Sequence, residues 1–188
     1  CDLNRRLQMR EGDNGEAYFR VLNPGGRHAL AVGLTQPVEI MIDGHTGYYC
    51  GGMNQQARIT VNGNVGTGVA ENMMSGSVRV KGDASQSAGA TAHGGILVIE
   101  GDASARCAIS LKGGNAVVCG SVGHMAAFMA QSGRLVVLGN VGADLGDSLY
   151  EADIYVRGSV ASLGADCEEK EISADDIAAL KQLLEEAD

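Results

Sequence analysis

Nucleophilic or metal chemistry in this 188-residue sequence would have to come from its cysteines, its histidines or closely spaced aspartates. The five cysteines form no Cys-x-x-Cys pair, so they predict neither a disulfide framework nor a zinc or cluster motif. The segments Gly66-Thr67-Gly68 and Gly113-Gly114 are rich in glycine, but no G-x-G-x-x-G opens a helix and no glycine–lysine phosphate loop occurs. We therefore expect no catalytic, cofactor-binding or metal-ligating residue on this chain.

A 19-residue repeat orders most of the sequence. One glycine recurs at every step, and the positions two and four residues before it and two after it are mostly Val, Ile, Leu or Ala. Apolar residues at alternate positions are typical of a strand with one buried face. The anchor glycines are Gly44, Gly63, Gly82, Gly101, Gly120, Gly139 and Gly158.

The repeat predicts an all-β fold, a single-stranded right-handed parallel β-helix (β-solenoid) of about seven 19-residue rungs. Neighbouring rungs should stack at ~4.8 Å. The hexapeptide acyltransferase coil is a competitor, but a repeat of six does not divide 19. Seven residues after each anchor, the sequence has only glycine or alanine, as at Gly51, Ala70 and Ala108. A column this small predicts a tight turn or a close approach to another backbone.

The stacking of the repeats does not bring the histidines or the cysteines together. His28, His45, His93 and His124 fall in different phases, which argues against a metal site. Cys50 and Cys107 share a column but lie three rungs apart, ~14 Å, too far for a disulfide. We interpret both as small core residues.

Short polar residues follow each anchor glycine. Side chains of this kind can hold a turn by bonding to its backbone. Asp83 and Asp102 would be neighbours on successive rungs, where a cation could lie between them, but two solvated carboxylates are the simpler interpretation. The column is His45, Asn64, Asp83, Asp102, Ser121, Asn140 and Ser159.

We divide the chain into three parts. Residues 1–36 form an N-terminal lead-in and cap, with the end of a helix near residues 2–10 and a strand over 18–22. Residues 37–167 form the β-helix. Residues 168–188 form an acidic C-terminal helix whose Ser173 has capping-box spacing. We expect this helix to cap the coil by lying over or beside the last rung, with partner binding as the alternative. Because the chain begins with Cys1 rather than methionine, we expect residues to precede it.

Charge and hydropathy exclude several classes of partner. The net charge is −9, and residues 166–188 carry nine acids and two bases. Without a basic patch, nucleic acid and anionic membranes are poor partners. No apolar run approaches the ~20 residues that span a bilayer. The unpaired thiols suit a cytoplasmic location.

Large side chains interrupt the small-residue pattern, mainly five to twelve residues after the anchor. Methionine and tyrosine on a surface are typical of an interface between proteins. A cap or loop of this chain packing over them is the alternative. If these residues form an interface, Met73→Asp should weaken assembly with the partner while the isolated chain keeps its fold. The candidate contact residues are Tyr48, Tyr49, Met53, Asn54, Glu71, Asn72, Met73, Met74, His124, Met125, Phe128 and Tyr150.

The segment Gly63-Asn64-Val65-Gly66-Thr67-Gly68 resembles the GXGXG family. That family includes the C-terminal β-helix of the glutamate synthase large subunit and one subunit of formylmethanofuran dehydrogenase. Longer strings look like the small GXGXG subunits of methylamine–glutamate N-methyltransferases, also called N-methylglutamate synthases. Among them are GHTGYYCGGMNQQA at 44–57 and LGDSLYEADIYVRGSVASLGADC at 145–167.

The resemblance implies a structural subunit of a hetero-oligomeric enzyme. One partner would be a class II glutamine-amidotransferase-like subunit, and another an FMN-binding synthase-like subunit with an iron–sulfur cluster. The reaction implied is methylamine plus L-glutamate giving N-methyl-L-glutamate and ammonia. No catalytic residue of the family transfers to this chain. The alternatives are a GXGXG subunit of a glutamate synthase, of another amidotransferase-linked complex or of a formylmethanofuran dehydrogenase, a self-associating β-solenoid binding module, and a free-standing enzyme.

Overall fold

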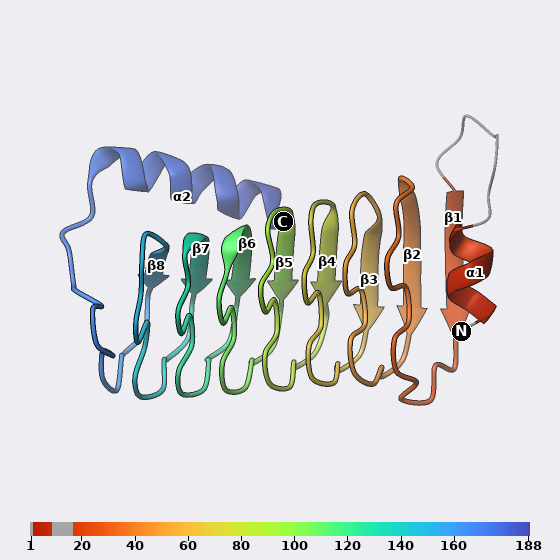
Figure 1. Ribbon diagram of the computed structural model, residues 1–188, viewed down its shortest axis with the longest axis horizontal. Coiled ribbons are helices and arrows are strands. Elements are labelled where there is room, and N and C mark those ends of the chain that lie inside the picture. Colours follow the sequence, from red (N-terminus) through yellow and green to blue (C-terminus); the bar gives the residue numbers. More distant parts are fainter. Residues whose placement is uncertain (1, 9–16) are drawn as a thin grey trace.

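The computed structural model describes residues 2–8 and 17–188. They form one parallel sheet, in which eight strands lie side by side in chain order and each is joined to the next by a long return loop (Figure 1). The result is a β-solenoid of about seven turns, which confirms the predicted fold class. The strands are β1 (Ala17–Leu22), β2 (Val38–Asp43), β3 (Arg58–Asn62), β4 (Ser77–Val80), β5 (Ile96–Ile99), β6 (Lys112–Val118), β7 (Ser132–Val137) and β8 (Asp153–Val156).

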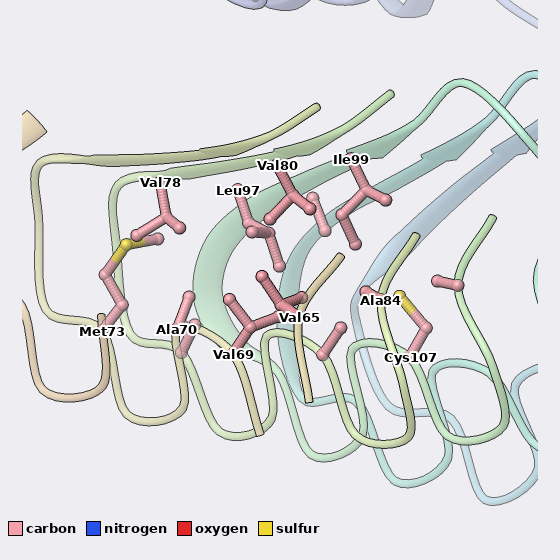
Figure 2. Close-up of a cluster of buried hydrophobic side chains, with 14 of the residues drawn as sticks. Val65, Val69, Ala70, Met73, Val78, Val80, Ala84, Leu97, Ile99 and Cys107 are labelled. Carbon is pink, nitrogen blue, oxygen red and sulfur yellow. The ribbon is translucent and has the colours of Figure 1, made fainter. Parts of the chain in front are cut away.

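The 19-residue spacing is the register of the sheet. From β2 onward, strand pairing aligns residues 19 apart, such as Ile40 with Ile59 and Val78 with Leu97, except where a register shift at the start of β6 pairs Lys112 with Ser132. A second ladder outside the strands joins Val65, Ala84 and Ala103 in the same way. Both ladders point branched or small apolar side chains into one narrow core (Figure 2). Like residues stacked on like residues therefore fill the interior with few aromatic rings.

The column of glycine and alanine seven residues after each anchor adopts a left-handed conformation in every rung except the last. From Gly51 to Gly146 its residues have positive φ, from 56° at Ala70 to 68° at Gly89, and so do the residues two before and two after them. Along each return loop, the N–H groups of every second residue point alternately to the following and to the preceding turn of the coil. The Tyr49 N–H donates to Thr67 O on the following turn, whereas the Ala70 N–H donates to Cys50 O on the preceding one. The return loop is therefore hydrogen-bonded on both sides, as a buried backbone requires.

The coil begins earlier than the repeat indicated. We assigned residues 17–36 to the lead-in, but they form a first turn whose strand β1 pairs with β2 at a spacing of 21 residues. Helix α1 (Asp2–Gln8) covers the core at this end. Its Leu7 is fully buried, and Asn4 Nδ2 donates to Ala29 O at 2.8 Å.

Helix α2 (Ala174–Glu186) is present as predicted, but it does not cover the end of the last turn. It runs back along the coil from β8 towards β5 (Figure 1) and packs on the outer face of the sheet. Its Leu183 and the following Ala187 lie against Val98, Val117 and Val136. In β3 and β4, the residues in register with these three valines are Thr60 and Arg79, which are polar.

Both ends of α2 are held by specific hydrogen bonds. At its start, the Ser173 hydroxyl accepts from the Asp176 N–H, and the Asp176 carboxylate accepts from the Ser173 N–H, which completes the predicted capping box. The Ser173 hydroxyl also donates to the Asp176 carboxylate at 2.6 Å, and this bond, together with that from the Ser173 N–H, lowers the pKa of the Asp176 carboxyl. At the far end, Arg79 donates to Ala187 O and pairs with Glu100. Neither helix in the described residues is long and apolar enough to cross a bilayer.

Leu183→Ala is expected to loosen α2 without unfolding the coil. The Leu183 side chain is buried against the outer face of the sheet, and such truncations cost about 2–4 kcal/mol. Faster proteolysis within residues 174–188, with the amides of β5 still protected from hydrogen exchange, would show this. Ile177→Ala is the matched control because Ile177 is exposed.

Candidate partner-binding surface

The predicted contact residues lie in the return loops, outside the sheet. We define the return surface as the exposed side chains four to twelve residues after each anchor glycine. Two apolar clusters stand out on it, one on the turns near the N-terminus and one near the C-terminus. The structure therefore places most of the predicted contact residues on the surface, but not in one continuous patch.

The N-terminal cluster consists of Tyr48, Tyr49, Met53 and Met74, each about half exposed. The Tyr48 and Tyr49 rings meet edge to face with centroids 6.4 Å apart. The ring of His28 lies 4.5 Å from Tyr48, and its Nδ1 accepts the Tyr48 N–H at 2.8 Å. These contacts hold the two tyrosines in place before any partner arrives, which lowers the entropy cost of binding.

The C-terminal cluster consists of Met129 and Tyr150, which are exposed, with Met125 and Phe128 partly exposed beside them. Three turns, ~14 Å at the stacking distance, separate Met129 from Met74, and four turns separate it from Met53. The loops in between present polar and basic side chains such as Thr91, His93, Arg106, Ser110 and Lys112. His124 is exposed, and Glu71 and Asn72 are partly exposed, at the borders of the clusters.

Two predicted contact residues are wrong as surface positions. Met73 and Asn54 are fully buried. Both lie ten residues after an anchor, in a column that points into the core, and Figure 2 shows Met73 near Val78. Asn54 instead stabilises the corner before β3, because its Oδ1 accepts the Ala57 N–H and its Nδ2 donates to Ala57 O.

Sequence reasoning missed two surface residues. Met129 lies in the same column as Met53, 76 residues and four turns earlier, so aligning the columns would have found it. His28 lies in the first turn, which the 19-residue count did not reach. Its contact with Tyr48 has no signal in the sequence.

The polar column after the anchors forms a ladder between turns. From His45 to Asn140, each side chain accepts the backbone N–H of the equivalent residue on the next turn, and not a group of its own turn. The Asp83 carboxylate accepts the Asp102 N–H at 2.9 Å, and the Asp102 carboxylate accepts the Ser121 N–H at 2.7 Å. His45 Nδ1 accepts the Asn64 N–H at 2.9 Å. This column is therefore scaffold.

Asp102→Ala is expected to cost about 1 kcal/mol of unfolding free energy, because the Ser121 N–H loses its acceptor. Asp102→Asn keeps an oxygen in place and removes a like charge beside Asp83, so it should cost less or stabilise the chain. Urea unfolding of both variants measures the difference. Equal losses in the two variants would contradict the ladder.

The thiols of Cys50 and Cys107 are unsuited to nucleophilic chemistry, because both are buried. Burial raises the pKa of Cys50 to about 11 and that of Cys107 to about 12. Both are core residues, as predicted, and neither forms a disulfide. Across residues 2–8 and 17–188, no group of three or more His, Cys, Asp or Glu side chains could hold a metal ion.

Comparison with known proteins identifies a relative that matches the whole chain. Over 187 residues, the chain is 55% identical to Protein GlxC of Rhizobium meliloti (strain 1021). The alignment covers all of this chain and 82% of the relative. No family model matches the chain, and no solved structure matches it.

Proposed function

This chain belongs to the same family as Protein GlxC, and we propose that it is a non-catalytic structural subunit of a multi-subunit, glutamate-synthase-like complex. The observation that carries the proposal is the return surface, where two apolar clusters, the N-terminal one preordered by its ring contacts, project from one stiff coil. Exposed tyrosine and methionine are enriched where proteins bind each other. The separation between the clusters suits two partner contacts held in fixed register.

The partners we propose are a class II glutamine-amidotransferase-like subunit and an FMN-binding synthase-like subunit carrying an iron–sulfur cluster. The reaction of the complex would be that of N-methylglutamate synthase, in which methylamine and L-glutamate give N-methyl-L-glutamate and ammonia. Transfer of an amine between two sites requires their fixed relative placement, which a stiff coil supplies. Cytoplasmic location is part of the proposal. The same geometry would serve a glutamate synthase, another amidotransferase-linked complex or a formylmethanofuran dehydrogenase.

Isolation of the chain from its native source under gentle conditions tests the proposal. We expect an amidotransferase-like chain and a yellow FMN protein to co-purify, as mass spectrometry and flavin absorbance would show. Elution of the chain alone would refute the structural-subunit role. Elution as a homo-oligomer would favour the self-associating module.

The variant Met74→Asp tests whether a partner binds at the N-terminal cluster of the return surface. Because a charge placed in an apolar interface is desolvated on binding, we expect at least a tenfold loss of partner affinity, measured by co-purification or calorimetry. The control is His93→Asp, since His93 is exposed in the same column one turn later but lies between the clusters. If both variants assemble equally well, the N-terminal cluster is not an interface.

A further inference from the structure

The C-terminal end of the coil leaves its core open. Val160 is 36% exposed, whereas Val141, one turn earlier in the same column, is 4% exposed. Leu163 is 43% exposed, and its pairing partner Leu145 is 3% exposed. At the other end, α1 covers the core, and α2 lies on the outer sheet face instead of here. The last turn therefore presents apolar side chains that a further layer would bury.

Strand β8 is also an open sheet edge. The Arg157 N–H donates to Val137 O, and backbone groups alternate in direction along a strand. The N–H and C=O groups of Ile154 and Val156 therefore point away from β7. No residue in the described part of the chain forms a backbone hydrogen bond with them. Residues 168–172 pass beside β8 on the way to α2 (Figure 1), and all their side chains are exposed.

The charge around this edge is strongly negative. Residues 139–172 contain eight acidic and two basic side chains, and all of the acids except Asp147 are exposed. A second copy of this chain would bring the same acidic end against it in a two-fold arrangement, which like charges oppose. The opposite end of another copy is covered by α1. The acids are Asp144, Asp147, Glu151, Asp153, Asp166, Glu168, Glu169 and Glu171.

We propose that this end of the coil binds an extended, basic segment of a partner polypeptide, which adds to β8 as a further strand. Its backbone would pair with the outward groups of Ile154 and Val156. Its alternate apolar side chains would cover the core end around Val160 and Leu163, and its Lys or Arg side chains would face the acidic rim. This surface is separate from the return surface, and the inference does not depend on the identity of the proposed complex.

The test uses the full chain and two defined peptides, acetylated and amidated, in which valine alternates either with lysine or with glutamate. The lysine peptide should bind saturably, shift the amide resonances of Ile154 and Val156, and slow their hydrogen exchange at least tenfold. The Tyr155 amide already faces β7 and should change little. Binding should weaken as salt rises. The glutamate peptide should not bind.

Two variants localise the binding. Val156→Pro removes an outward N–H at an edge, where proline is tolerated, and should weaken the lysine peptide at least tenfold. Glu169→Lys with Glu171→Lys reverses two exposed charges without touching β8, and should weaken it as well. Met74→Asp should leave peptide binding unchanged, which separates this inference from the proposed function. Equal binding of both peptides, shifts confined to other turns, no binding at millimolar peptide, or a dimer formed through β8 would each overturn it.

Discussion

Met73→Asp is expected to prevent folding, whereas Met74→Asp should leave the fold intact. The Met73 side chain is 0% exposed and that of its neighbour is 48% exposed. A carboxylate at position 73 would be buried among apolar side chains (Figure 2) with no partner. A buried, unpaired charge costs several kcal/mol, against a total stability of about 5–15 kcal/mol for a typical domain. Circular dichroism and urea unfolding of the two variants would measure the contrast.

Met73→Leu provides the control for this pair. Exchange of methionine for leucine conserves volume and polarity, so it should cost less than about 1.5 kcal/mol. A folded Met73→Asp protein with a stability close to that of Met74→Asp would show that position 73 is accessible. The opposite result, loss of folding in Met74→Asp, would show that the return surface is part of the core.

The fold was predictable from the sequence because the repeat is also the register. A residue's column decides whether its side chain is buried, and Met53 and Met129 share both a column and an exposed surface. The contact prediction was wrong at Met73 because it relied on the large side chain and not on the residues at the same position of the other repeats. The ten-residue column contains Met73, Ala92, Leu111 and Ala130, which together indicate a core position.

The placement of α2 was harder to predict, although a signal was present. An amphipathic helix can bury its apolar face against any apolar surface, and the outward residues Val98, Val117 and Val136 supplied one on the sheet. A strand with outward valines on a solvent-facing side predicts a covering element. The first turn escaped detection for another reason. Its 21-residue spacing to β2 breaks the period, so it is visible only once the strands are paired.

The anchor glycines are required because successive turns touch at that position. A Cβ atom on Gly139 would lie 2.5 Å from both the C and O atoms of Gly120, far inside ordinary contact. Backbone atoms cannot move aside as a flexible side chain can, and the Gly139 N–H also donates to Gly120 O at 2.9 Å. The coil can stack at this corner only if the residue has no side chain.

Gly139→Ala is therefore expected to cost about 3 kcal/mol of unfolding free energy or more, because it forces two turns apart and weakens their hydrogen bonds. The matched control is Gly52→Ala. Gly52 is buried, whereas Gly139 is partly exposed, and neither has a positive φ, but a Cβ on Gly52 would meet its nearest atoms at 3.4 Å, an ordinary contact. In urea unfolding, the free energies of the two alanine variants should differ by at least about 2 kcal/mol, because the ordinary contact made by a Cβ at position 52 costs little. Equal losses in the two variants would contradict close stacking of the turns as the reason for glycine in the anchor column.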